Sequence, residues 1–216
     1  MPCSVFPKYT RGERIADGAL HVVGIVASVV AFVVLIRLGM NGETALMVAG
    51  FTIYGIALVA TFCCSASYHF VTRPRAKEIL RRFDHAAIFL MIAGTYTPFV
   101  LFQLNNAWGY SLLAVVRAIA IFGIAIKLIA PESLNRVSTA LYLVQGWAVV
   151  LAWEPLRAAS PASVLILLVV GGVLYTVGVV FHLWNRLPYQ NAIWHAFVLV
   201  AAACHYAAVV DMVQLA

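Results

Sequence analysis

The chain has 216 residues, of which 64% are hydrophobic and only 10% are charged. A water-soluble domain of this length does not need so apolar a composition, so the sequence indicates a polytopic membrane protein. Lys and Arg outnumber Asp and Glu by 14 to 8, which gives a net charge of +6. We attribute this excess to membrane orientation and to attraction toward anionic lipids, and we expect membrane lipids as partners and no nucleic acid.

Seven apolar stretches are each long enough, at about 20 residues, to cross the hydrocarbon core of a bilayer. A transmembrane β-barrel would show alternating polarity, whereas residues 164–173 are apolar on every face. The sequence therefore predicts an all-α fold, with residues 1–216 forming a single seven-helix transmembrane domain. The longest connection is expected around residues 71–83, and the expected spans are 17–37, 44–66, 84–104, 108–129, 135–154, 161–182 and 192–213.

The distribution of Lys and Arg predicts the orientation of the bundle, because short cytoplasmic connections are enriched in these residues. With the N-terminus inside, eleven of the fourteen lie in cytoplasmic segments, two (Arg37 and Arg157) lie outside, and Arg117 falls within the fourth span. We therefore expect a cytoplasmic N-terminal segment over residues 1–16 and a multi-pass protein of the inner (cytoplasmic) membrane. Its oligomeric state is left open by the sequence.

The polar side chains of the predicted spans gather at one end of the bundle. Threading the helices through a bilayer brings their polar ends to the same side, which is cytoplasmic in the predicted orientation. Ionisable groups in a membrane are costly unless they are paired, solvated or bound to metal, so they indicate a functional site. The residues concerned are Asp17, His21, Ser65, His69, Asp84, His85, His182, Asn191 and His195.

Neutral imidazoles together with a carboxylate form a donor set that suits Zn²⁺. We predict that His69, His195 and Asp84 converge from three helix ends as metal ligands, with Asn191 one helical turn from His195 on the same face. His205 lies ten residues beyond His195, about 15 Å along a helix, and cannot share the site.

Structural roles remain open alternatives for several of these residues. Asp17 and His21 are spaced to form a hydrogen-bonded pair that ties the first helix to the bundle, and Asp84 is placed to cap the third helix. His69 and His195 have the corresponding alternative of interhelical hydrogen bonding without a metal.

The arrangement of motifs resembles the hemolysin III family, the bacterial branch of the progestin and adipoQ receptor (PAQR) proteins. The matching stretches are residues 13–24, the Ser65-x-x-x-His69 pair, residues 82–98, and residues 187–198 followed by His205. The resemblance implies seven transmembrane helices and a cytoplasmic-side Zn²⁺ held by three histidines, with an Asp near the metal-bound water. It also implies kinship with membrane hydrolases that act on lipid amides such as ceramides.

The chain departs from the family pattern at two places. Asn191 stands where the family usually has a histidine ligand, and Asp17 stands where it usually has Asn, with Leu20 nearby in place of a hydroxyl residue. Asp84 would then take the vacant ligand position. Asp17 adds a negative charge close to the site and would partly compensate for the lost ligand, either directly or by orienting His21.

We consider three functions at this stage. In the first, a zinc-dependent hydrolase of lipid amides or esters uses Asp84 to accept a proton from water and Ser65 to orient the water or to stabilise the developing oxyanion. The second is a non-catalytic regulator or receptor-like protein of membrane homeostasis, in which the metal is structural. The third is a pore-forming cytolysin, although no ladder of polar residues crosses a full span.

Overall fold

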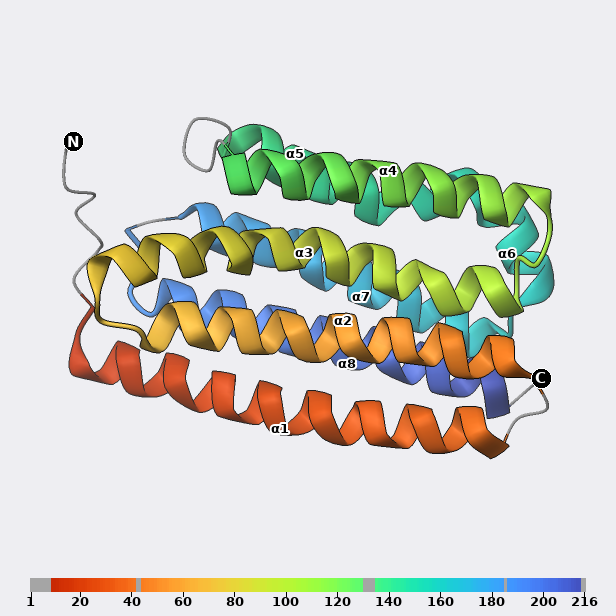
Figure 1. The fold of residues 1–216 in the computed structure, drawn as a ribbon, viewed down its shortest axis with the longest axis horizontal. Coiled ribbons are helices and arrows are strands. Elements are labelled where there is room, and N and C mark those ends of the chain that lie inside the picture. The colour runs from red at the N-terminus through yellow and green to blue at the C-terminus, as the bar shows by residue number, and fades with distance from the viewer. Residues whose placement is uncertain (1–8, 42–43, 130–134, 185, 215–216) are drawn as a thin grey trace.

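The computed structural model describes residues 9–41, 44–129, 135–184 and 186–214, and these residues form an all-helical bundle without strands (Figure 1). Seven of its helical segments are long and apolar enough to cross a membrane, which confirms the predicted class and the number of spans. The elements are α1 (Arg11–Asn41), α2 (Ala45–Phe70), α3 (Pro74–Phe102), α4 (Ala107–Ile129), α5 (Asn135–Trp147), the 3₁₀ helix η1 (Ala148–Ala152), α6 (Trp153–Ala159), α7 (Ala162–Leu183) and α8 (Gln190–Gln214).

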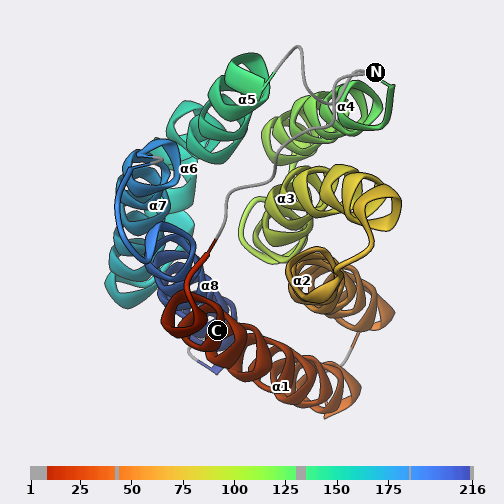
Figure 2. The same cartoon turned by 90° about the vertical axis from the view of Figure 1, so that its left-hand side faces the viewer.

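The helices follow one another around the bundle, and α8 returns to pack beside α1 (Figure 2). The segments α5, η1 and α6 together make the fifth span, so α1 starts at one end of the bundle and α8 finishes at the other (Figure 1). We call the end where α1 starts the proximal end. Helices α3, α5 and α8 also start there, and α2, α4 and α7 finish there. Helices α2 and α8 both pack against α1.

Helix α1 shows the inverted polarity of a membrane-embedded helix. Its buried residues include Asp17, His21 and Ser28, whereas Val22 and Val26 are more than half exposed. In water such an exposed valine face would be a large apolar patch, and in a bilayer it contacts lipid chains.

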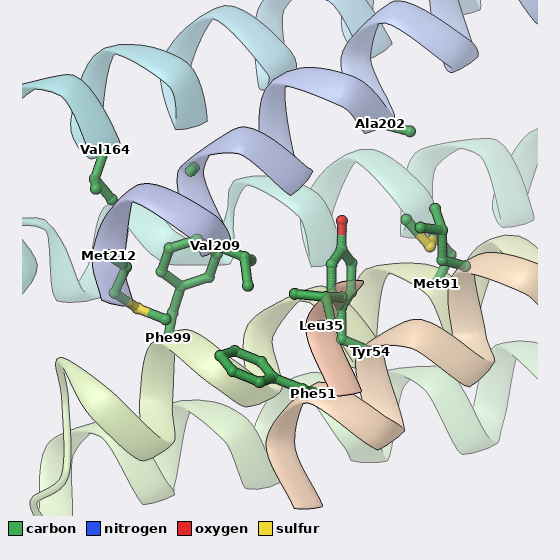
Figure 3. Close-up of a cluster of buried hydrophobic side chains, with 11 residues drawn as sticks. Leu35, Phe51, Tyr54, Met91, Phe99, Val164, Ala202, Val209 and Met212 are labelled. Atoms are coloured by element: carbon green, nitrogen blue, oxygen red, sulfur yellow. The ribbon is translucent and has the colours of Figure 1, made fainter. Parts of the chain in front are cut away.

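One cluster of buried apolar side chains lies toward the distal end of the bundle, opposite the proximal end. Figure 3 shows the side chains of this cluster. There Leu35, Phe51 and Tyr54 are fully buried against Val164 and Val209, so that α1, α2, α7 and α8 are held by one cluster. A second cluster packs α4, α5, η1 and α6 onto α3. The proximal end is thereby left to polar side chains.

Two boundaries differ from the sequence prediction. Helix α3 begins at Pro74 rather than near residue 84, so the expected connection over residues 71–83 is mostly helix. Its charged residues concealed the helix from a hydropathy criterion, although proline is well suited to a first helical position. The fifth span is interrupted at η1, just before Pro155, because proline cannot continue an existing α-helix without losing a hydrogen bond.

The close approach of α2 and α3 gives a test of this packing. A Cβ atom added at Gly94 would lie 2.6 Å from the Cβ atom of Ala57, whereas one added at Gly146 meets nothing within 4 Å. We expect Gly94→Ala to lower the free energy of unfolding by about 1–3 kcal/mol through overpacking. Thermal unfolding in detergent measures the effect, with Gly146→Ala as the matched control. Equal midpoints for the two variants would contradict the packing described here.

Candidate metal centre

Four side chains from three helices meet at the proximal end. Asp17 and His21 lie one turn apart on α1, His69 lies at the end of α2, and His195 lies in the second turn of α8. One potential ligand atom from each residue lies within 4.8 Å of those from the others. His21 is 2% exposed and the side chains of the other three are 13% exposed, so the cluster is screened from bulk solvent.

Asp17 fixes the protonation of all three imidazoles. Its carboxylate oxygens lie 2.9 Å from Nδ1 of His69 and 2.6 Å from Nδ1 of His195, and its main-chain oxygen lies 2.7 Å from Nδ1 of His21. A carboxylate or carbonyl oxygen only accepts hydrogen bonds, so each Nδ1–H donates. A neutral imidazole carries one ring proton, so Nε2 of each histidine is then unprotonated. The contacts with Asp17 therefore leave each of the three Nε2 atoms with an available lone pair.

Ser65 lies on the other side of these rings. Its Oγ is 3.2 Å from Nε2 of His21 and 3.5 Å from Nε2 of His195, and the carboxyl group of Asp84 lines the same cavity. All three of these neighbours are acceptors when the histidines are neutral and Asp84 is ionised, but a serine hydroxyl has one proton. The site therefore holds more acceptor lone pairs than donor protons. Such an excess of lone pairs favours the binding of a cation or of a further proton.

The donor set fits a divalent transition metal. Three imidazoles and a neighbouring carboxylate are typical ligands of such ions, and a carboxylate that holds the far nitrogen of a metal-binding histidine is a common supporting contact. In a tetrahedral zinc site two ligand atoms are about 3.3 Å apart. The Asp17 contacts to His69 and His195 are shorter than this, so they are hydrogen bonds rather than pairs of ligands on one ion.

The cluster lies between spaces of different character. His21, Ser65 and His195 line a central cavity. This central cavity adjoins an apolar cavity between the helices, and the two share Thr61 and Trp194 among other residues. On the other side, Asp17 and His69 line a polar opening, together with Arg14, Lys77 and Tyr189. The centre thus lies between an apolar interior and the polar surface of the proximal end.

The predicted residues occupy different places around this centre. His69 and His195 belong to the cluster, and Asp17 and His21, which were predicted to support the ligands, belong to it as well. Asp84 and Asn191 line the same cavity but are not among the four grouped residues. Their assignment as ligands stays a prediction.

Asp17 is the residue whose importance the sequence understated. Its spacing to His21 was visible, but its contacts with His69 and His195 depend on α2 and α8 packing on either side of α1. His205, by contrast, lies apart from the cluster as expected and contacts the main-chain oxygen of Leu168 on α7 at 3.3 Å.

A seven-span helical bundle with a buried cluster of three histidines and an aspartate defines the class: a polytopic membrane protein with a polar, metal-type centre at one end. Within that class, the profile of the family described as Haemolysin-III related matches residues 12–206. The chain belongs to this family, and the resemblance seen in its motifs is confirmed.

Bacterial and animal relatives support the assignment. The chain is 38% identical over 198 residues to the Hemolysin-3 homolog of Bacillus subtilis (strain 168), covering 92% of this chain and 93% of that protein. It is also 38% identical over 191 residues to Hemolysin-3 of Bacillus cereus, covering 88% and 87%. The monocyte to macrophage differentiation factor of Homo sapiens is 27% identical over 163 residues, covering 73% of this chain and 67% of its own.

Proposed function

We propose that this protein is a zinc-dependent hydrolase of membrane lipids, with the zinc held by His21, His69 and His195 through the ring nitrogens that Asp17 does not engage. The observation that carries the proposal is the excess of acceptors at Ser65, where two histidine Nε2 atoms share one hydroxyl proton and the Asp84 carboxyl group lines the same cavity. A cation resolves this imbalance, and three imidazoles select a transition metal. The excess of Lys and Arg on the proximal side supports a cytoplasmic position for the site.

The chain's own residues supply the remaining functions. When bound, zinc provides Lewis acidity that polarises a carbonyl group and acidifies water. Asp17 holds the three rings in the correct tautomer and orientation. Asp84 accepts the proton of the attacking water, and Ser65, which lines the same cavity, orients that water.

The reaction is the addition of water to an amide or ester carbonyl. The bond from the carbonyl carbon to nitrogen or oxygen breaks, the acyl part leaves as a carboxylic acid, and Asp84 returns its proton to the amine or alcohol. The protein therefore needs no further reactant than lipid and water.

The apolar cavity supports a lipid substrate. Its wall is largely apolar and includes Met91, Ile92, Leu143 and Val179. A pocket with this lining suits a hydrocarbon chain. A chain lying there would present its carbonyl group where the two cavities adjoin, beside His85 and Trp194.

The test is release of fatty acid from a panel of ceramides and ester lipids by the purified protein in detergent. We expect Asp84→Asn to lower the rate by about 10²-fold or more, because general base catalysis is lost, while the zinc content is unchanged. Asp211→Asn, the same substitution near the distal end of α8, is the matched control and should retain full activity. Stoichiometric zinc without release of any fatty acid would exclude the hydrolase and favour the regulator.

A further inference from the structure

The apolar cavity continues into a second apolar cavity toward the distal end of the bundle. We call this second space the distal cavity, and its wall includes Val100, Leu104, Leu112, Trp153 and Leu156. The described residues that line it include no Asp, Glu, Lys or Arg. Leu104, Leu112 and Leu156 are at most 5% exposed and belong to the second apolar cluster, so the distal cavity ends on packed side chains.

The apolar and distal cavities meet at a ring of residues from four helices, which we call the throat. The residues that line both cavities are Thr95, Tyr96, Gly146, Trp147, Gly172 and His205. The hydroxyl group of Tyr96 donates to the main-chain oxygen of Gly146 at 2.8 Å and accepts from the N–H of Val149 at 2.8 Å. The indole N–H of Trp147 donates to Oγ1 of Thr176 at 3.0 Å, which ties α5 to α7. Hydrogen bonds thus hold the frame of the throat.

Gly146 leaves this throat open. Thr139 and Leu143 line the apolar cavity from α5 and precede Gly146 by seven and three residues, so the three positions share one face of the helix. A Cβ atom added at Gly146 would meet nothing within 4 Å. A larger side chain at this position would therefore extend into the throat without first colliding with a neighbouring helix.

The depth of the two cavities corresponds to a definite length of hydrocarbon chain. His85, beside the proposed position of the carbonyl group, precedes Thr95 and Val100 on α3 by about 15 Å and about 22 Å along the helix axis. Carbon–carbon bonds of about 1.5 Å at angles of about 111° advance about 1.25 Å per carbon in an extended chain. About 12 carbons then reach the throat, and about 18 reach the far end of the distal cavity.

We infer that the throat makes the protein selective for long acyl chains, because only a chain that passes it fills the distal cavity. A chain that ends short of the throat leaves the wall of the distal cavity without contacting atoms and forfeits their dispersion attraction. The chain belongs to the lipid whose carbonyl group lies at the metal centre. The inference therefore rests on the proposed function and adds a specificity to it.

The experiment locates the end of the chain by photo-crosslinking in the full-length protein, reconstituted in lipid nanodiscs. The probes are decanoic acid and octadecanoic acid, each with a diazirine at its last carbon, and mass spectrometry identifies the labelled residues. We expect octadecanoic acid to label the distal cavity at Leu104, Leu112 or Trp153, and decanoic acid to label the apolar cavity at Ile92 or Tyr175. Labelling of the apolar cavity alone by both probes, or of neither cavity, would overturn the inference.

A variant assigns the selectivity to the throat. Gly146→Leu should lower labelling of the distal cavity by octadecanoic acid about tenfold or more, because its side chain occupies the throat, while labelling by decanoic acid is unchanged. Val144→Leu adds bulk two residues away at a position that is 60% exposed and should change neither probe. Unchanged labelling of the distal cavity in a folded Gly146→Leu would contradict the role of the throat. If that variant does not fold, the two probes on the unmodified protein still decide.

The same probes separate this inference from the proposed function. Fatty acids are products of the proposed reaction, so their labelling requires no turnover. Release of fatty acid together with labelling of the apolar cavity alone by both probes would reject only the throat. The expected labelling without any release would reject only the hydrolase.

Discussion

Replacing His195 by alanine is expected to remove the metal from the protein. The unmodified protein, purified in detergent without chelators, should contain about one zinc per chain, and His195→Ala should contain less than about a tenth of that. The physical reason is that His195 supplies one of three imidazoles, and two remaining rings do not form a closed zinc site. Inductively coupled plasma mass spectrometry measures the content directly.

The matched control lies on the same helix. His205→Ala removes an imidazole that contacts the main-chain oxygen of Leu168, away from the cluster, so the variant should retain its zinc. Thermal unfolding in the presence of chelator checks that both variants fold to a similar extent. Zinc content that falls equally in the two variants, or that is absent from the unmodified protein, would contradict a metal centre at His195.

The sequence was sufficient to predict the general architecture because membrane spans are defined by a local property, the length of an apolar segment. That criterion missed helical segments that are rich in charged residues, such as the first turns of α3 between Pro74 and Phe83. It also could not show the break in the fifth span, because a proline is compatible with either a kink or an interruption. Local sequence therefore predicts how many helices cross, and with less accuracy where each begins.

The site was predictable only to the extent that it depends on helix ends. His69 and His195 could be brought to one end by counting spans, without knowledge of which helices touch. The central position of Asp17 could not be obtained in this way, since it requires α1 to lie between α2 and α8. Contacts between segments separated by 178 residues, such as Asp17 and His195, are a property of the tertiary structure alone.

Asp17 is consequently the residue on which we place the most specific expectation. In Asp17→Asn the side chain keeps one oxygen that accepts a hydrogen bond. Its NH₂ group is a donor, however, and would face the Nδ1–H of one histidine, which is also a donor. One of the two rings, His69 or His195, must then turn or change tautomer. We expect zinc affinity to fall by about 10- to 100-fold, as is usual when a carboxylate that orients a metal-binding histidine is lost. Competition with a chromophoric chelator gives the dissociation constant.

Asn191 offers the complementary substitution. It lies one turn before His195 on α8 and lines the same cavity, so Asn191→His places a further imidazole beside the centre. The double variant Asp17→Asn with Asn191→His should therefore recover much of the lost affinity. A purely structural role for Asp17 predicts a different result. Asp17→Asn would then unfold at a lower temperature with chelator present, but its zinc affinity would be unchanged. Asn191→His would have no lost affinity to restore. Measuring affinity and apoprotein stability on the same preparations separates the two roles, because only an orienting carboxylate links the tautomers of His21, His69 and His195 to the metal.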